Sequence, residues 1–274
     1  MSGCRFGLIC DQLTSVDVVT AGGQLLEASA TENPDLFWAI RGWGGNFGIA
    51  TSFEYRLHPF DERAVGGHLA FPIDQARQAL RGFGDQFDRA SDGLWIEPIL
   101  TTTPGGGRAL VMDVCLTEDL ASSDAILAPY RRLGKPLKDA VGPVHYAQLQ
   151  TQDDERARIA LPPKGAAVDR VAPDATAFWH RDALYSVLLQ ASGDDPAEDA
   201  ANVGWARSQW PVLEKFTAGF YANTNLSEMS SARVRDAYGG NYDRLLALKR
   251  RYDPTNLFRL NANIDPKGVA TEVG

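Results

Sequence analysis

A glycine-rich stretch, Gly42-Trp43-Gly44-Gly45-Asn46-Phe47-Gly48, is the segment whose composition first suggests ligand chemistry. A dinucleotide-binding loop has the pattern GxGxxG between a strand and a helix, so that the N-terminus of the helix faces the pyrophosphate. Phe47 stands where the third glycine is required, and the following residues predict a strand instead of a helix. The stretch therefore argues against a Rossmann site. Two interpretations remain: a bend that lets the backbone approach a ligand or another strand, and a bend with a purely structural role.

Thiol and imidazole groups are the next candidates for chemistry, but their spacing predicts neither a metal site nor a disulfide framework. The groups are Cys4, Cys10, Cys115, His58, His68, His145 and His180. The cysteines are odd in number and include no CxxC pair, and no two histidines have metal-ligand spacing. No metal is therefore expected, and reduced thiols fit a cytoplasmic protein. Two interpretations of His180 remain, a residue that faces an active cleft and a buried structural residue; the structural one is favoured, so the sequence identifies no catalytic base.

The elements that must position the glycine stretch are predicted to be strands and one short helix. Residues 16–20 and 24–30 flank Ala21-Gly22-Gly23, which predicts a β-hairpin. Asn33-Pro34-Asp35 predicts a helix start, because Asn and Asp cap helices and Pro suits the first turn. Residues 49–57 alternate apolar or large side chains with small or polar ones. This period of two predicts a strand with one buried face.

The remainder of the chain mixes helical and extended patterns. Helices are predicted at residues 73–87, 117–133, 197–213 and 238–252, and strands at residues 94–100, 109–116, 166–171 and 183–190. Residues 150–165 are charged and then proline-rich without periodicity, which predicts a loop. The sequence therefore predicts an α+β fold.

Charge and hydropathy argue against two classes of partner. The formal net charge is −8 and the isoelectric point is near 5.0, whereas nucleic-acid binding requires clustered Lys and Arg. No apolar run approaches the ~20 residues that a membrane-spanning helix needs, and the first residues show no apolar core of a signal peptide. We therefore expect no nucleic-acid partner, no membrane association and a cytoplasmic location.

Motifs along nearly the whole chain carry a family resemblance. Near the start they are Asp11-Gln12-Leu13 and residues 16–23, 32–42 and 44–49. Near the end they are residues 238–245, 252–258 and 259–264. Between them lie His145-Tyr146, Thr176-Ala177-Phe178 and residues 180–183. In this order they resemble the berberine-bridge-type FAD-linked oxidases, flavoproteins of the vanillyl-alcohol-oxidase (PCMH-type) class.

The resemblance implies a fold, a cofactor and a reaction. It implies a partial PCMH-type FAD-binding domain, residues 1–58 and 216–274 with the berberine-bridge C-terminal segment. Residues 59–215 would form a substrate domain with an antiparallel sheet backed by helices. The implied cofactor is FAD, and the implied substrate is a small molecule such as a sugar or a secondary metabolite. In the family reaction an alcohol or C–H bond loses a hydride to the flavin, a base takes the proton, and oxygen reoxidises the flavin.

The resemblance also implies the cofactor-binding positions, residue by residue. The backbone of Gly45, Asn46, Gly48 and Ile49 is implied to approach FAD. The residues implied to lie beside the flavin ring are Tyr221 and Asn223, in a Tyr-x-Asn element, and the C-terminal pair Asn261 and Asn263. An amide can both donate and accept hydrogen bonds, as the edge of a flavin requires. Without the resemblance, Tyr221 would be interpreted as a strand residue and Asn223 as a turn residue.

The sequence departs from the family pattern at several places. The upstream section that cradles the phosphates and carries the covalently attached His or Cys has no counterpart here, so no covalent attachment residue is assigned in this chain. Thr224 stands where many relatives carry a catalytic Tyr, and a threonine hydroxyl is a poor base near neutral pH. The stretch of residues 148–166 is shorter than the corresponding stretch in relatives. Trp43 stands where relatives have a Gly, and Gly22 stands where they usually have an Asp.

These departures leave three hypotheses. The chain is an FAD-linked oxidase, a truncated non-catalytic remnant or binding module without stable flavin, or half of a split flavoenzyme. In the last case, a partner chain supplies the missing FAD-binding section. An oxidase predicts flavin colour in the purified protein alone, and a remnant predicts no colour even with added FAD. A split enzyme predicts colour only when the partner chain is present. The sequence names neither the substrate nor the oligomeric state.

Overall fold

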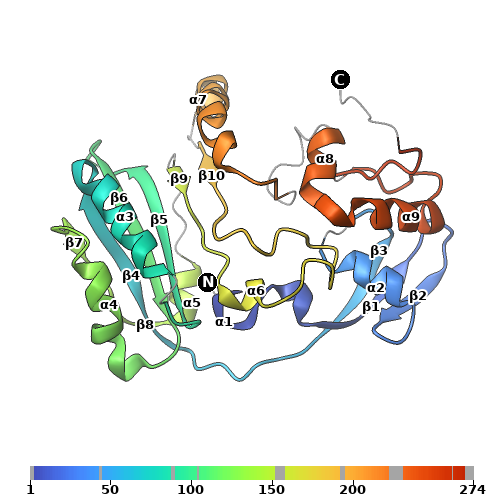
Figure 1. The fold of residues 1–274 in the computed structure, drawn as a ribbon, viewed down its shortest axis with the longest axis horizontal. Helices are drawn as coiled ribbons and strands as arrows, with labels where there is room; N and C mark the ends of the chain where they lie inside the picture. Colours follow the sequence, from blue (N-terminus) through green and yellow to red (C-terminus); the bar gives the residue numbers. More distant parts are fainter. Residues whose placement is uncertain are drawn as a thin grey trace. The chain divides into compact units, whose positions relative to one another are not determined.

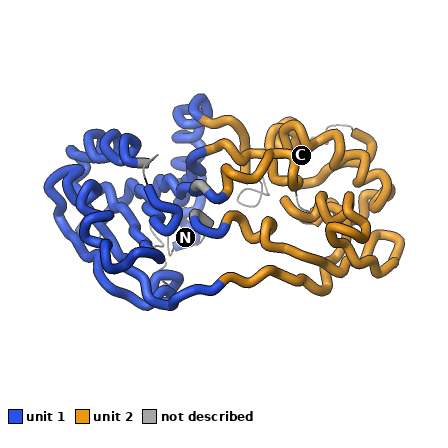
Figure 2. The backbone as a smooth tube through the Cα atoms, turned by 60° about the horizontal axis from the view of Figure 1, so that its bottom comes forward, with its two compact units in different colours: residues 1–6, 59–167, 184–216 blue, residues 7–58, 168–183, 217–274 orange. Residues whose placement is uncertain are grey.

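The computed structural model describes residues 3–42, 45–87, 90–103, 105–151, 158–191, 195–221, 231–260 and 262–268, which form an α+β fold (Figure 1). The chain divides into two compact units (Figure 2). Unit 1 consists of residues 1–6, 59–167 and 184–216, and unit 2 of residues 7–58, 168–183 and 217–274. Residues 168–183 thus belong to unit 2, whereas the sequence-based division kept them in the substrate domain. The assignment of cofactor and substrate to the two units stays a prediction.

Unit 1 is built around a seven-stranded antiparallel sheet. Its strands are β4 (Arg63–Pro72), β5 (Leu94–Thr102), β6 (Arg108–Leu116), β7 (Lys138–Asp139), β8 (Gly142–His145), β9 (Arg158–Ala160) and β10 (Leu188–Gln190). Their order is β10-β9-β5-β6-β4-β7, and β8 also pairs with β4. The predicted strand–loop–strand pattern is confirmed as the hairpin β5–β6 at the centre of the sheet.

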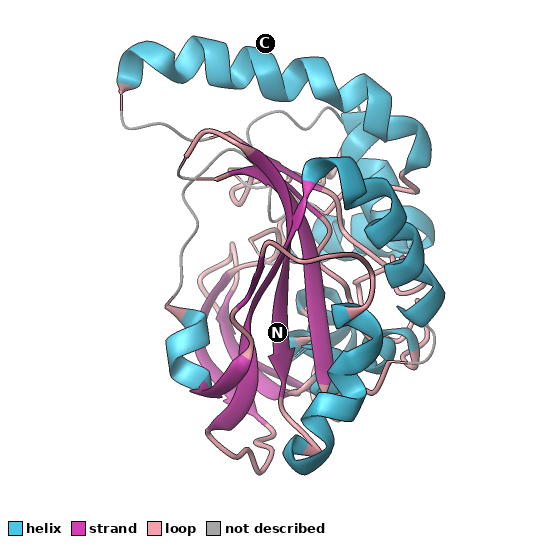
Figure 3. Cartoon of the chain, turned by 90° about the vertical axis from the view of Figure 1, so that its left-hand side faces the viewer, coloured by secondary structure: helices cyan, strands magenta, loops and turns pink. Residues whose placement is uncertain are grey.

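Helices α3 (Ala76–Phe87) and α4 (Ser123–Arg131) cover one face of this sheet, and both were predicted. Alternate strand residues point to that face, where Leu69, Ile96 and Met112 are almost fully buried. The same core contains Phe83 of α3 and Leu127 of α4. Figure 3 shows helices along one side of the strands. Among the described residues, four further α-helices lie outside the core of unit 2: α1 (Gly3–Phe6), α5 (Tyr146–Gln150), α6 (Ala166–Asp169) and α7 (Asp199–Leu213).

The opposite face of the sheet carries a row of titratable side chains. His68, Asp113 and Glu97 lie directly across from one another on β4, β6 and β5, so their side chains project from the same face. The Nδ1 atom of His68 lies 2.7 Å from Oδ1 of Asp113. Burial, and secondly the Asp113 carboxylate, raise the pKa of Glu97 from 4.5 to about 7. Folded protein therefore keeps this proton at pH values where an unfolded chain has released it.

We expect Glu97→Gln to stabilise the protein at alkaline pH. Because the folded pKa of Glu97 lies above the unfolded one, the free energy of unfolding falls as pH rises from 4.5 to about 7. The variant loses this dependence, and its free energy of unfolding should exceed that of wild type by on the order of 1 kcal/mol at about pH 8. Denaturant unfolding at about pH 5 and about pH 8 measures the difference.

The control for this prediction is Glu62→Gln, since the Glu62 side chain is 78% exposed. It should change the free energy of unfolding little, and similarly at both pH values. A Glu97→Gln variant that is less stable than wild type at alkaline pH would contradict the expected sign.

Unit 2 combines a three-stranded antiparallel sheet with the helices α2 (Pro34–Ile40), α8 (Ser231–Tyr238) and α9 (Tyr242–Tyr252). Strand β1 (Leu13–Val19) lies between β2 (Leu25–Ser29) and β3 (Ile49–Tyr55). The predicted hairpin is confirmed by the antiparallel pairing of β1 with β2, and the predicted helix start by Pro34 in the first turn of α2. The core places Val18 of the sheet, Leu36 of α2 and Leu245 of α9 in one buried cluster.

The sequence-based assignment is wrong for three segments. The strand predicted at residues 166–171 is wrong, because Ala166–Asp169 form helix α6. The loop predicted at residues 150–165 contains strand β9, whose pairing with β5 depends on a distant segment and leaves no local pattern. The strand predicted at residues 183–190 shrinks to β10. The prediction also lacked β4, although it is a ten-residue strand. No helix among the described segments is long and apolar enough to cross a membrane.

Strand β3 exists as predicted, but its single buried face does not. A register shift opposite Asp17 and Val18 places an extra residue, Thr51, in β3. Such a β-bulge breaks the alternation of side chains. Ile49 is 57% and Phe53 51% exposed, and Ala50 alone in the strand is partly buried. Strand β3 lies at the edge of the described sheet.

Candidate active site: an aromatic pocket in unit 2

A pocket of about 400 Å³ lies within unit 2. It is lined by Leu8, Ile9, Cys10, Leu13, Val18, Ile40, Gly42, Gly45, Phe47, Gly48, Ala50, Phe53, Tyr55, Phe178 and Tyr221. None of these side chains carries a formal charge at neutral pH. Apolar and aromatic side chains with a few polar groups are typical of a site for a flat organic ligand.

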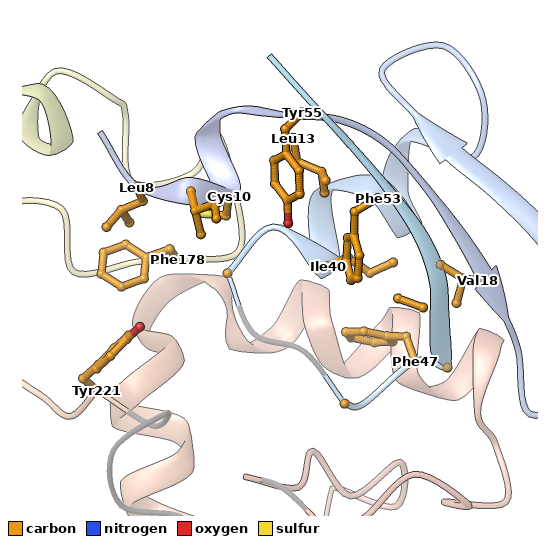
Figure 4. Close-up of a pocket in the computed structure, with 15 residues that line it drawn as sticks. Leu8, Cys10, Leu13, Val18, Ile40, Phe47, Phe53, Tyr55, Phe178 and Tyr221 are labelled. Atoms are coloured by element: carbon orange, nitrogen blue, oxygen red, sulfur yellow. The ribbon is translucent and has the colours of Figure 1, made fainter. Parts of the chain in front are cut away.

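Aromatic rings form two groups around the pocket. Figure 4 shows Phe47 and Phe53 on one side and Phe178 and Tyr221 on the other, with the Tyr55 hydroxyl group pointing between them. The centroids of the Phe178 and Tyr221 rings are 6.1 Å apart at an interplanar angle of 70°. Phe53 is 51%, Tyr55 38% and Tyr221 44% exposed. Several exposed aromatic rings at one pocket mark a surface that another group covers.

The glycines of the pocket allow the chain to pack closely around it. A Cβ atom at Gly42 would stand 2.3 Å from the backbone nitrogen of Phe178, and one at Gly48 would stand 2.5 Å from the Val19 carbonyl oxygen. Gly45 has a φ of +86°, a conformation that favours glycine. In the described part of the glycine stretch, Gly42 and residues 45–48, the backbone therefore approaches two other segments and also borders the pocket.

A buried ion pair holds one wall of the pocket. Arg181 donates from Nη1 and Nη2 to the two carboxylate oxygens of Asp11, both at 2.7 Å. The Arg181 side chain is 1% and the Asp11 side chain 9% exposed. Asp11 also accepts from the backbone nitrogen of Leu8, and Arg181 donates to the Phe178 carbonyl oxygen. The pair thus ties the segment that carries Leu8 to the segment that carries Phe178.

Asn46 lies behind the pocket, in the core. Its Nδ2 donates to the Tyr238 hydroxyl at 3.2 Å and to the Ala262 carbonyl at 3.1 Å, and its Oδ1 accepts from the Ile264 nitrogen at 3.0 Å. Its own backbone carbonyl accepts from Nζ of Lys249 at 2.8 Å. The side chain and carbonyl of Asn46 therefore bind protein groups and fasten the glycine stretch to the C-terminal segment.

The described residues that the resemblance assigned to FAD all belong to unit 2. Gly45, Gly48 and Tyr221 line the pocket, Asn46 lies behind it, and Ile49 is exposed and outside the lining. The Oδ1 atom of Asn263 is buried and has no hydrogen-bond partner among the described residues. Asn223 and Asn261, together with Thr224, lie outside the described residues. That these residues bind FAD stays a prediction.

Sequence reasoning missed much of the lining, notably Leu8, Cys10, Phe53, Tyr55 and Phe178. Phe178 lies in a family motif, but the pattern alone gave no sign that its ring faces a pocket. Cys10 was considered only as a metal or disulfide candidate. Burial, and secondly the Asp11 carboxylate, raise the pKa of the Cys10 thiol to about 11. The thiol is therefore neutral at physiological pH and forms part of an apolar wall.

The described residues fit the ring system of FAD rather than its phosphates. Rings of Phe53, Phe178 and Tyr221 offer faces for stacking. The buried Oδ1 of Asn263 has no donor among the described residues, which costs about 1–3 kcal/mol, although Asn263 is not among the residues that line the pocket. Phosphates require cationic side chains or helix N-termini, and no cationic side chain is among the described residues of the lining.

Comparison with known proteins identifies relatives over the whole chain. The family model "Berberine and berberine like" matches residues 220–265. The (R)-6-hydroxynicotine oxidase of Paenarthrobacter nicotinovorans is 27% identical over 96% of this chain and 68% of its own length. An uncharacterised FAD-linked oxidoreductase of Bacillus subtilis is 27% identical over 95% of this chain and 66% of its own length. The chain thus spans about two thirds of the length of these curated relatives.

Solved structures share the fold. The crystal structure of 6-hydroxy-D-nicotine oxidase from Arthrobacter nicotinovorans matches with a TM-score of 0.80 and 24% identity, over 96% of this chain and 68% of that one. A berberine-bridge-like protein of Physcomitrella patens matches with a TM-score of 0.80 and 18% identity, over 100% of this chain and 68% of that one. The C-terminal segment thus matches the berberine-bridge family model, and the relatives that align with nearly the whole chain are FAD-linked oxidoreductases, which supports a berberine-bridge-like flavoprotein with FAD as its cofactor.

Proposed function

We propose that this chain is the part of an FAD-dependent oxidase that binds the flavin ring and a small-molecule substrate. The reaction is oxidation of an alcohol or C–H bond, in a substrate such as a sugar or a secondary metabolite. The observation that carries the proposal is the uncharged aromatic pocket of unit 2, bordered by Gly45, Gly48 and Tyr221. The names of relatives, among them a xylooligosaccharide oxidase of Thermothelomyces thermophilus, support the substrate class.

The chain's own residues would bind and orient the ring and exclude water. Phe53, Phe178 and Tyr221 present apolar faces, and removal of water strengthens the hydrogen bonds that remain. Asn263, which does not line the pocket, has a buried Oδ1 that meets no donor among the described residues. The chemistry that FAD supplies when bound is acceptance of a hydride. The described residues identify no proton acceptor for the substrate, and we assign none at this site.

The expected result of an FAD titration is a yellow, saturable complex that persists through gel filtration. Phe53→Asp should weaken FAD binding by about tenfold or more, because it places a charge where an apolar ring would lie. Phe53 is 51% exposed, so the substitution should leave the fold intact. Leu25→Asp is the matched control, since Leu25 is 66% exposed on β2 and does not line the pocket. Equal affinities of the two variants would contradict the assignment of the pocket.

A second candidate is half of a split enzyme, in which a partner polypeptide completes the flavin site. It is favoured by the edge position of β3 in the described sheet and by the exposed rings of Phe53 and Tyr55, which stack 6.1 Å apart at 20°. An edge strand with apolar side chains pairs readily with another chain. Colour that forms only with the partner polypeptide supports this candidate. A protein that stays colourless under all conditions supports a remnant without flavin.

We place this activity in the cytoplasm, with a small-molecule substrate and without a nucleic-acid partner. This location rests on the cysteine pattern of the sequence, which has an odd number of cysteines and no CxxC pair. The net charge of −8 opposes binding to phosphate backbones.

A further inference from the structure

Lys249 is a fully buried cation whose ammonium group bonds to residues outside the pocket lining. Its side chain is 0% exposed, and it lies on α9, outside the pocket lining. An ammonium group has three N–H donors. Here they reach the Asn46 carbonyl at 2.8 Å, Oδ2 of Asp253 at 2.7 Å and the Phe258 carbonyl at 2.7 Å. All three donors are therefore used, and they join the glycine stretch to the segment after α9.

Asn46 makes a second set of bonds to the same C-terminal segment. Its amide bonds to the Ala262 carbonyl and to the Ile264 nitrogen. Ala262 and Ile264 are the two neighbours of Asn263, whose buried Oδ1 has no partner in the described part of the chain. Asn46 thus holds the backbone on both sides of Asn263.

We propose that Lys249 and Asn46 are positioning residues of the cofactor site. They hold Asn46 and its described neighbours to Phe258, Ala262 and Ile264 before FAD binds. The inference rests on the proposed function, because its ligand is the flavin that the pocket is proposed to take. If the buried charge of Lys249 served stability alone, an apolar side chain in its place would stabilise the protein at least as well. Its three bonds to separate segments instead fix geometry, as supporting groups do around a binding site.

The test compares Lys249→Met with Asp253→Asn. Lys249→Met removes every bond from the side chain to the glycine stretch. Asp253→Asn disturbs the buried charge pair but leaves the bond from Lys249 to Asn46 in place. Lys267→Met is the surface control, because Lys267 is exposed in the same unit. Each variant is measured for its FAD dissociation constant, its free energy of unfolding and the amide exchange of residues 45–48.

Lys249→Met should weaken FAD binding by about tenfold or more, as loss of supporting groups does at other sites. It should also speed amide exchange at residues 45–48. Asp253→Asn should lower stability but change both readouts less, and Lys267→Met should change neither. If Lys249→Met does not fold, Asn46→Ser is used in its place, with the same expected increase in exchange and in the dissociation constant.

Two results would overturn the positioning role. One is an unchanged FAD affinity in Lys249→Met; the other is a loss of affinity that simply follows the loss of stability in both variants. If wild type binds no FAD, the proposed function fails separately. Amide exchange then decides the remaining claim: equal exchange at residues 45–48 in Lys249→Met and wild type would show that the network does not hold this stretch.

Discussion

Replacement of Arg181 by Met should lower the free energy of unfolding by about 3–5 kcal/mol, the largest loss that we expect from one substitution. The physical reason is the carboxylate of Asp11, which is 9% exposed and would remain buried without its bidentate partner. Thr176 would also lose its bond from Nη2 of Arg181 at 2.6 Å. Denaturant unfolding measures the change. Because the pair joins two walls of the pocket, FAD affinity should fall as well.

A second substitution in the same background separates buried charge from lost packing. Asp11→Asn with Arg181→Met removes both charges, so the double variant should recover on the order of 2 kcal/mol of the loss. The exposed control is Asp243→Asn, since Asp243 is 82% exposed in its pair with Arg235. Exposed pairs contribute at most about 1 kcal/mol. A single variant as stable as this control would show that the Asp11–Arg181 pair does not hold the wall.

Gly42→Ala should cost about 3 kcal/mol and weaken FAD binding, although it adds one methyl group. The added Cβ would lie 2.3 Å from the Phe178 nitrogen and 2.4 Å from the Ala177 carbonyl carbon. Both atoms belong to backbone, which cannot rotate away as a flexible side chain can. The segment that carries Phe178 must move, and Phe178 lines the pocket. Unfolding and FAD titration of the same preparation measure the two effects.

Gly204→Ala is the control of opposite sign. Gly204 lies in α7 with nothing within 4 Å of the added atom. Alanine in an exposed helix should stabilise the protein by up to about 1 kcal/mol. If Gly42→Ala also stabilised the protein, the close approach of the Gly42 backbone to residues 177 and 178 would be refuted.

Elements with strong local signals were predictable. The helix α9 follows a clear apolar stripe, and Asp253-Pro254 ends it. The hairpin β1–β2 follows from a glycine turn between two apolar runs. Strand β9 was not predictable, because its three residues gain their extended form from pairing with β5. Four residues of α6 likewise carry too little pattern to separate a helix from a strand.

The site was predictable only where a motif marks the chain. Gly45, Gly48 and Tyr221 carry family motifs, and the structure brings them to one pocket. Phe53 and Tyr55 were seen as strand residues, but the bulge at Thr51 breaks the alternation on which their burial was judged. The Asp11–Arg181 pair joins residues that are 170 positions apart in the chain. No pattern in a single sequence reports such a contact.

We expect the flavin ring of FAD to occupy the aromatic pocket of unit 2. A crystal structure grown with FAD, together with any polypeptide that completes the protein, tests it most directly. The account predicts the ring between Phe53 and Tyr221, with the glycine stretch at its side. A flavin ring bound elsewhere on the chain, while this pocket holds solvent, would contradict it.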